Sequence, residues 1–434
     1  MNDFAITANI VDPVRGAVHP GTVTVSGGRI RAVAETKGPA ATFLLPGLVD
    51  AHVHVESSLL VPSEFARLAV RHGTVAAVCD PHEIANVLGP AGVRFMIENS
   101  RAVPFKFAFG ASSCVPATPF ESAGARIGPD EVREMLTWPE IGFLAEMMNF
   151  PGAIAGDPEV MAKIAAAHAL GKPVDGHAPG LIGPELARYI DHGIRTDHEC
   201  LSHAEAREKI GLGMKILVRE GSAAKNLDML LPLLDEFPEH CMFATDDIKP
   251  DDLARDHIRL LVSRAAGSGI DFMKVLRADT LNPAHHYGLK IGLLQPGDPA
   301  DFIEVDDLVN LRVLRTFING QLTASDGETV IPPETGDSPN RFEAMAISPA
   351  DLRVPDRGRP VRLIQTHDGQ LLTGAAQARC RVEDGCLVSD REGDILKIVV
   401  LNRYQRKPPA LGFVRGFGLR RGAIASSVAH DSHN

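Results

Sequence analysis

The chain has 434 residues and a formal net charge of −11, which disfavours a nucleic-acid binder because such proteins need clustered basic side chains. Its 44% hydrophobic and 23% charged residues are typical of a folded protein rather than a disordered one. No run of 18 apolar residues occurs and the start, Met1-Asn2-Asp3-Phe4, is unlike a signal peptide, so we expect a cytoplasmic protein without membrane partners.

The first 45 residues are predicted to form short strands. Apolar and polar residues alternate over 22–25 and 30–33, a period of two that indicates half-buried strands. We expect turns at Gly16, at Gly21 and at the pair Gly27-Gly28. Residues 1–45 would be the first half of a small β-sandwich domain.

The next 245 residues alternate short apolar runs with segments of helical character. This alternation predicts repeated βα units and a parallel sheet. Eight units over 46–290 match the size of a (β/α)8 barrel of the TIM type, an α/β fold. A doubly wound sheet is the alternative. The runs cover 48–54, 74–80, 105–111, 141–147, 173–177, 194–198, 214–219 and 241–246.

Several helix ends within this region can be predicted. Pro158 and Gly171 bracket one helix, and Pro184 and Gly193 bracket the next. Ser202, followed three residues later by Glu205, forms the pattern of a capping box.

The rest of the chain resembles the first flank and then changes character. Residues 291–335 contain strand-like runs at 300–305 and 316–318 before an Asn319-Gly320 turn, and they are predicted to complete the β-sandwich. A Pro-rich linker covers 331–339. Residues 340–434 would form a partial C-terminal α+β domain, and we expect strands at 395–401 and 413–414 to lack later partners.

Six candidate metal ligands stand at the carboxyl ends of predicted strands. In a barrel these ends face the active site. Imidazoles and carboxylates meeting there suit one or two divalent cations with nitrogen and oxygen ligands. The six are His52, His54, Glu146, His177, His198 and Asp246.

The other histidines have different positions. His72, His168 and His192 lie near predicted helix ends, where an imidazole interacts favourably with the helix dipole, and we exclude them as ligands. His203 follows the capping Ser202 and is assigned to a helix start. Four more stay unassigned: His240, His257, His285 and His286.

Other enzyme signatures are incomplete or absent. His54-Val55-Glu56 matches half of the zinc deaminase signature, but the Pro-Cys-x-x-Cys half is missing. Neither a P-loop nor a Gly-x-Ser-x-Gly elbow occurs.

The motifs in these positions carry a resemblance to a known family. Pro46-Gly47-Leu48-Val49-Asp50-Ala51-His52-Val53-His54 resembles the metal-binding opening of the amidohydrolase superfamily. Four stretches in order resemble its adenine deaminase family over essentially the whole chain. They are His52-Val53-His54-Val55-Glu56-Ser57-Ser58, Asp80-Pro81-His82-Glu83-Ile84-Ala85-Asn86, Asp175-Gly176-His177-Ala178-Pro179-Gly180 and Thr196-Asp197-His198-Glu199.

This resemblance implies a function and a site. It implies hydrolysis of adenine to hypoxanthine and ammonia by a hydroxide held in a binuclear metal centre, with Mn²⁺ favoured over Fe²⁺ or Zn²⁺. Glu146 would bridge the two ions, and Asp246 would move the proton. Glu56, His82 and Glu83 are further catalytic candidates, and Ser57 and Ser58 are candidates for binding adenine. Asp247 would support Asp246 or be solvated.

The carboxyl end leaves two other hypotheses open. His430, Asp431 and His433 would contact the substrate, but family members continue well past this stretch, so the chain resembles a truncated form. A catalytically impaired metal-binding remnant is therefore one alternative. A cyclic-amide hydrolase of the dihydroorotase or imidazolone type is the other. The family also includes homo-oligomers, although no interface is visible in the sequence.

Overall fold

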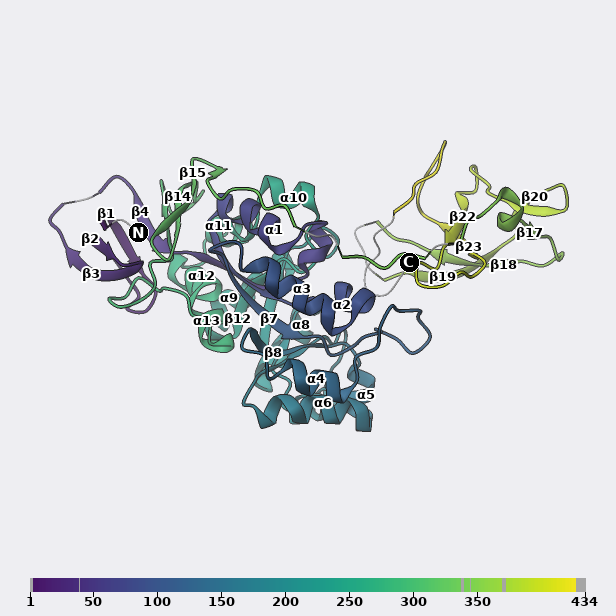
Figure 1. Cartoon of the computed structure of the whole chain (residues 1–434), viewed down its shortest axis with the longest axis horizontal. Helices are drawn as coiled ribbons and strands as arrows, with labels where there is room; N and C mark the ends of the chain where they lie inside the picture. Colours follow the sequence, from purple (N-terminus) through teal and green to yellow (C-terminus); the bar gives the residue numbers. More distant parts are fainter. Residues whose placement is uncertain (1–2, 39, 337–338, 344, 369–371, 427–434) are drawn as a thin grey trace.

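The computed structural model describes residues 3–38, 40–336, 339–343, 345–368 and 372–426. A strand-rich region with the N-terminus, a central α/β body and a second strand-rich region follow one another along the long axis of the molecule (Figure 1). The predicted substrate contacts His430, Asp431 and His433 lie outside the described residues.

The central body is a closed barrel of eight parallel strands, as predicted. One ladder joins the first five strands and another joins the last three. Two bridges, Val174 to Ile194 and Val53 to Asp246, connect the ladders at both edges and close the ring. This closure excludes the doubly wound sheet. The strands are β5 (Leu48–Val53), β6 (Thr74–Cys79), β7 (Lys106–Ala111), β8 (Ile141–Met147), β9 (Val174–Gly176), β10 (Thr196–Asp197), β11 (Lys215–Arg219) and β12 (Cys241–Ala244).

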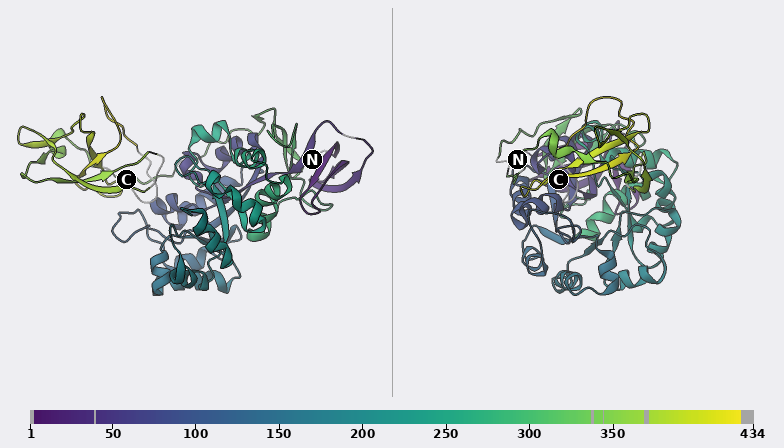
Figure 2. Two further views of the ribbon diagram at one scale, coloured as in Figure 1. Left: turned by 180° about the vertical axis from the view of Figure 1, so that it is seen from behind. Right: turned by 90° about the vertical axis from the view of Figure 1, so that its right-hand side faces the viewer.

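Helices surround the barrel strands, and the right-hand view of Figure 2 shows them as a ring. The α-helices are α1 (Pro62–Ala69), α2 (His82–Leu88), α3 (Pro90–Ser100), α4 (Pro129–Met135), α5 (Phe150–Ala155), α6 (Pro158–Ala169), α7 (Gly183–Asp191), α8 (His203–Gly211), α9 (Leu227–Glu236), α10 (Pro250–Arg255), α11 (Ile258–Gly267), α12 (Phe272–Asp279) and α13 (Leu281–Tyr287). Short 3-10 helices are η1 (Val55–Ser58), η2 (Val70–His72), η3 (Pro238–His240) and η4 (Pro349–Leu352).

The predicted helix ends are mostly confirmed. Helix α6 begins at Pro158, with Asp157 as its N-cap. The capping box of α8 is only half formed. The Ser202 hydroxyl accepts from the Glu205 amide at 3.1 Å, but the Glu205 carboxylate accepts from the amides of Gly180 and Leu201 instead of Ser202. Glu205 is buried against these two loops. Its carboxylate accepts from two amide groups that would otherwise be buried without a hydrogen-bond partner.

Both flanks of the barrel contribute strands to one mixed sheet. Strand β4 of the first flank pairs antiparallel with β13 of the second, so that Phe302 lies opposite Pro46. Hydrogen bonding makes this a single continuous sheet in the order β16-β15-β14-β13-β4-β1-β2-β3. Its strands are β1 (Phe4–Asp12), β2 (Ala17–Ser26), β3 (Arg29–Glu35), β4 (Phe43–Pro46), β13 (Phe302–Val305), β14 (Val313–Ile318), β15 (Gln321–Ser325) and β16 (Glu328–Thr329).

The prediction of a turn at Gly21 was wrong. Gly21 lies inside β2, opposite Ala8 in β1 and Glu35 in β3. A Cβ atom there would meet the Ile10 side chain at 3.0 Å and the Ala34 carbonyl oxygen at 3.1 Å. The glycine therefore serves close packing in the middle of the sheet. Gly27 and Gly28 do form the β2 to β3 turn, both with positive φ.

The sheet packs on the amino ends of the barrel strands. The Thr316 hydroxyl donates to the Val70 carbonyl at 2.8 Å, and the Gly47 amide donates to the Asp301 carbonyl at 3.2 Å. Ile303 and Val305 share a hydrophobic core with Leu48 in the barrel. This end of the barrel serves stability, and the carboxyl ends of the strands are left for chemistry.

The C-terminal region forms two small sheets, β17-β21-β20 and β19-β18-β23-β22. Leu363, Leu387, Ile395 and Phe413 form its small core. Among its described residues the only helix is η4, so the helical part of the α+β expectation was wrong there; apolar residues that alternate along its runs favour strands. The strands are β17 (Val354–Pro355), β18 (Val361–Gln365), β19 (Gly374–Ala378), β20 (Arg381–Glu383), β21 (Cys386–Val388), β22 (Ile395–Val400) and β23 (Ala410–Arg415).

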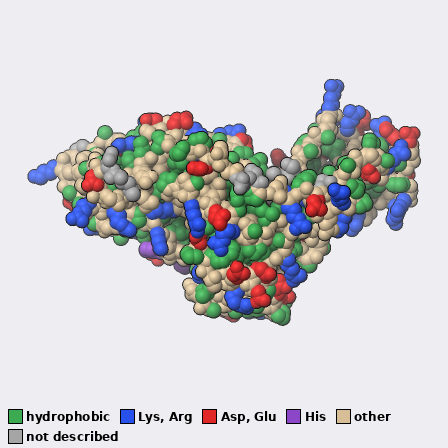
Figure 3. Space-filling model, in the orientation of Figure 1, with side chains coloured by type: hydrophobic (Ala, Val, Ile, Leu, Met, Phe, Trp, Pro, Cys, Tyr) green, Lys and Arg blue, Asp and Glu red, His purple; other side chains and the backbone are tan. Residues whose placement is uncertain are grey.

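Helices within the described ranges are all too short or too polar to cross a bilayer. Acidic and basic side chains are interspersed over the face seen in Figure 3.

Candidate metal centre

The barrel brings the six predicted ligands together. His52 lies in β5 and Glu146 in β8. Three more directly follow strand ends, His54 after β5, His177 after β9 and His198 after β10, and Asp246 lies two residues beyond β12. Five of the six are buried, and His177 keeps a side chain that is 25% exposed. The set therefore has one partly open side, at His177.

The two histidines of the first strand point at one another and at Asp246. Their Nε2 atoms are 3.2 Å apart. The Asp246 Oδ1 atom lies 3.5 Å from Nε2 of His52 and 3.1 Å from that of His54. The His54 Nδ1 atom lies 2.9 Å from the Asp80 carbonyl oxygen, so Nδ1 donates to that carbonyl and Nε2 would be the atom that binds a cation.

Main-chain bonds fix Asp246 in this position. Its amide donates to the His52 carbonyl at 2.8 Å, and its carbonyl accepts from the His54 amide at 3.1 Å. Asp246 has a φ of +57°, a strained backbone conformation for a residue other than glycine. Such strain is tolerated where the surroundings hold the residue, and it is common at functional sites.

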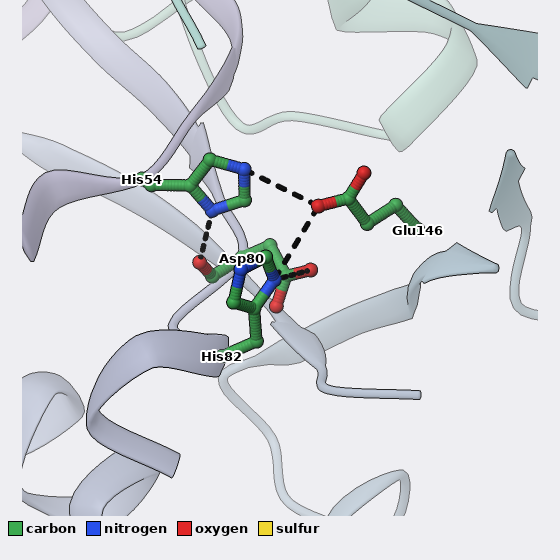
Figure 4. A group of neighbouring side chains, drawn as sticks. All are labelled: His54, Asp80, His82 and Glu146. Atoms are coloured by element: carbon green, nitrogen blue, oxygen red, sulfur yellow. Dashed lines mark hydrogen bonds and ion pairs between the residues drawn. The ribbon is translucent and has the colours of Figure 1, made fainter. Parts of the chain in front are cut away.

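Glu146 lies between imidazoles on both of its oxygens. Oε1 is 3.3 Å from Nε2 of His54 and 3.3 Å from Nδ1 of His82, as Figure 4 shows. Oε2 is 2.7 Å from Nδ1 of His177 and 3.2 Å from Nε2 of His198. A carboxylate flanked by imidazoles on both oxygens could contribute ligand atoms to a cation held here.

The charges of the site favour a bound cation. Burial alone would raise the pKa of Glu146, but His177, His198 and His54 hold the pKa well below its usual range. Likewise burial would raise the pKa of Asp246, and Arg219 and the nearby histidines hold it low. Both carboxylates are therefore anionic and buried, a state that needs positive partners.

The neighbouring carboxylates in turn raise the pKa of a histidine in the site. Burial would lower the pKa of His198, but Glu146, Asp246 and Glu199 raise it to about 9. Overlapping sets of three or four His, Asp and Glu atoms lie within 4.8 Å of one another here, including His52, His54 and Asp246. The donor set and its negative charge fit a divalent metal ion.

The other predicted catalytic residues border this cluster. His82 Nδ1 lies 3.1 Å from Asp80 Oδ2, and Glu83 Oε2 lies 3.6 Å from His54 Nδ1. Glu83 also stands in the first turn of α2, where a carboxylate interacts favourably with the helix dipole. Glu56 accepts from the Ile84 amide at 3.2 Å, and burial beside Glu83 raises its pKa to about 8.

The two serines of η1 differ. The Ser57 hydroxyl donates to Asp247 and lies 3.5 Å from Glu83 Oε1, so Asp247 has a buried partner at the site rather than only solvent. The Ser58 hydroxyl donates to the Val55 carbonyl at 2.6 Å and is fully buried. Contact of either serine with adenine stays a prediction.

Sequence reasoning missed Asp80, Glu199 and Arg219. Asp80 lies among His54, His82 and Glu146. Arg219 donates to the carboxylates of both Glu199 and Asp246. Asp80 and Arg219 each end a predicted strand. Asp80 would have been found had the rule been applied to every carboxylate at a strand end, whereas Arg219 was left out because a guanidinium is not a metal ligand.

The histidines excluded from the site lie where helix ends predict them. His72 ends η2 and contacts the Leu253 carbonyl at 3.0 Å, and His192 caps α7. His203 is the first residue of α8. The unassigned His257 is fully buried, with Nε2 3.1 Å from Asp50 Oδ2 and Nδ1 2.8 Å from the Thr74 hydroxyl.

Solved structures with this fold include a deaminase and a dipeptidase. An adenosine deaminase from Xanthomonas campestris with bound zinc matches with a TM-score of 0.54 and 19% identity, covering 75% of this chain and 94% of that one. A beta-aspartyl dipeptidase from Fervidobacterium islandicum matches with a TM-score of 0.55 and 16% identity, covering 76% and 98%. At these identities the matches establish the fold alone.

Family models and full-length relatives are more specific. The model described as "Amidohydrolase family" matches residues 43–323, and the one described as "Adenine deaminase C-terminal domain" matches 370–434. An adenine deaminase of Salinibacter ruber is 55% identical over 432 residues, which cover 99% of this chain and 79% of that protein. One of Methanosarcina mazei is 50% identical, covering 98% and 79%. This chain therefore belongs to the adenine deaminase family of the amidohydrolases.

Proposed function

We propose that this chain hydrolyses adenine to hypoxanthine and ammonia. The observation that carries the proposal is the placement of Glu146 between two pairs of imidazoles in a chain of this family. A bound divalent cation supplies Lewis acidity and lowers the pKa of water toward neutrality. Carboxylate ligands favour Mn²⁺, with Fe²⁺ or Zn²⁺ as alternatives. The ligands would be His52, His54, Glu146, His177, His198 and Asp246.

Asp246 is the proposed proton carrier. Its Oδ1 atom faces His52 and His54, while its Oδ2 atom accepts from Arg219. Oδ1 is thus the oxygen that would take a proton from the attacking water. The same oxygen would then deliver the proton to the departing amine, which leaves as ammonia.

The groups on η1 and α2 would bind the purine ring. Glu56, Ser57 and Glu83 lie together, because the Ser57 hydroxyl is 3.5 Å from Glu83 and Glu56 accepts from the first turn of α2. Addition of water at C6 moves negative charge onto the ring nitrogens, so polar groups on this side, with His82, would stabilise the adduct. Adenine is small and neutral, and its ring nitrogens and amino group can form hydrogen bonds with these polar groups.

The test is an ammonia-release assay on adenine with the full chain loaded with Mn²⁺, together with metal content per chain. We expect hypoxanthine and ammonia in equal amounts. Glu146→Gln, His177→Ala and Asp246→Asn should each lower kcat by at least about a hundredfold, because each removes a ligand or the proton carrier. Full activity in any of the three would contradict the site.

A substrate screen that follows the loss of each substrate separates the alternatives. Turnover of dihydroorotate or an imidazolone in place of adenine would identify a cyclic-amide hydrolase. Metal binding without any turnover would identify an impaired metal-binding protein. Location in the cytoplasm and homo-oligomer formation stay predictions.

A further inference from the structure

Lys209 on α8 is fully buried and has three oxygen partners. Its Nζ atom donates to Asp197 Oδ2 at 2.8 Å, to Glu205 Oε1 at 2.6 Å and to the Ala178 carbonyl at 2.7 Å. A buried ammonium group is stable only when such anions and acceptors surround it. The two carboxylates are equally buried and depend on Lys209 in turn.

Two partners of Lys209 adjoin the candidate ligands: Ala178 follows His177 and Asp197 precedes His198, while Glu205 lies one turn away on α8 itself. Asp197 Oδ1 accepts from the Ala178 amide at 2.9 Å. Glu205 accepts from the Gly180 amide and from the Leu201 amide, each at 2.9 Å. One network therefore joins the segment just after His177 to the segments on both sides of His198.

Backbone pairing alone joins these loops weakly. Strand β9 has three residues and β10 has two. The bridge between them is formed by Val174 and Ile194, at the amino end of β9 and before β10. At the carboxyl end, side chains therefore have to set the spacing between the two strands.

That spacing matters because the imidazoles of His177 and His198 both contact the same oxygen of Glu146. His177 Nδ1 lies 2.7 Å and His198 Nε2 lies 3.2 Å from Glu146 Oε2. Their ring centroids are 5.2 Å apart. A displacement of either loop by about half an ångström would spoil a shared coordination geometry.

We propose that Lys209 is a positioning residue, which holds the loops 177–180 and 197–201 together so that His177 and His198 bind metal with Glu146. Lys209 touches neither ligand. It acts through Asp197 and Glu205 and their bonds to the main chain. The inference rests on the proposed function only for its kinetic readout.

The test compares Lys209→Met with Lys172→Met. Lys172 is the control. It is half-buried, its Nζ atom donates to the carbonyl oxygens of Leu136, at 2.5 Å, and of Ile141, and it lies before the amino end of β9, away from the ligands. Mn²⁺ affinity is measured by titration of metal-free protein, beside circular dichroism to verify folding. We expect the affinity to fall roughly 10- to 100-fold in Lys209→Met and less than threefold in Lys172→Met.

A kinetic readout separates positioning from general stability. In Lys209→Met at saturating Mn²⁺, kcat for adenine should fall at least tenfold while KM stays within threefold, because the ring-binding groups lie on η1 and α2. A folded variant with the parent's metal affinity and kcat would overturn the proposal, as would an equal loss in Lys172→Met.

Glu205→Gln keeps the test decisive if Lys209→Met does not fold. It weakens the ties to Gly180 and Leu201 but leaves the pair of Lys209 with Asp197. We expect a three- to tenfold loss of Mn²⁺ affinity, and an unchanged affinity would again overturn the proposal. If the parent binds Mn²⁺ but leaves adenine intact, the proposed function fails while the affinity comparison still decides the role of Lys209.

Discussion

At the scale of single residues, Arg219 sets the orientation of the Asp246 carboxylate. It is 4% exposed and donates to both oxygens of Glu199 and to Oδ2 of Asp246. A planar guanidinium can hold two carboxylates at once, which a lysine ammonium does less well. Arg219 thereby turns Oδ1 of Asp246 toward His52 and His54.

We predict that Arg219→Met lowers kcat for adenine at least tenfold. It also leaves Glu199 and Asp246 buried without their cation, so the free energy of unfolding should fall by about 3–5 kcal/mol. Steady-state kinetics and urea unfolding measure the two effects.

Arg264→Met is the control for this change. Arg264 pairs with Glu220 and Asp228 but its side chain is one-third exposed. Its loss should cost less than about 1 kcal/mol and leave kcat unchanged. Parent-like kcat in a folded Arg219→Met variant would show that Asp246 needs no such orientation.

At the scale of elements, the passage from β4 to β5 needs a residue without a side chain. A Cβ atom on Gly47 would lie 2.2 Å from Cγ1 of Val75 in β6, far inside contact distance. Gly142 in β8 offers a contrast, since a Cβ atom there would meet nothing within 4 Å.

We therefore expect Gly47→Ala and Gly142→Ala to differ. Gly47→Ala should lower the free energy of unfolding by about 1–3 kcal/mol through overpacking. Gly142→Ala should be neutral or stabilise by up to about 1 kcal/mol, because alanine restricts the unfolded chain. Equal effects of the two substitutions on urea unfolding would contradict this prediction, because they would mean that β6 can move away from a new Cβ atom at no cost.

At the scale of the whole molecule, Asp301 joins the barrel to the sheet. This fully buried residue pairs with Lys106 of β7 and accepts from the Gly292 amide at 2.9 Å and the Asn319 amide at 2.8 Å. These contacts lie at the amino ends of the strands, away from the metal centre.

We predict that Asp301→Ala costs stability but not catalysis. The free energy of unfolding should fall by about 2–4 kcal/mol, because two amides lose their acceptor and the partly exposed Lys106 loses its anion. The kcat for adenine should stay within twofold of the parent.

Asp235→Ala provides the exposed counterpart of this change. Asp235 pairs with Lys274 at 2.5 Å on the surface, so its loss should cost less than about 1 kcal/mol. A large drop in kcat for Asp301→Ala would show that the sheet and the metal centre are coupled.

The sequence by itself determined the barrel and its candidate ligands. Apolar runs and helix ends are local patterns, and each barrel strand was predicted to within two residues at either end. Because parallel strands end at the same face, the position of a histidine or carboxylate at a strand end already predicted that His52, Glu146 and Asp246 would meet.

Only the tertiary structure decided how these groups are held. The bonds of Arg219 to Glu199 and Asp246, and of Lys209 to Ala178, join residues 20 to 31 positions apart. The pairing of β4 with β13 joins residues about 260 apart. No local period encodes such contacts, since they depend on where packing brings two side chains and on the need of each buried charge for a partner.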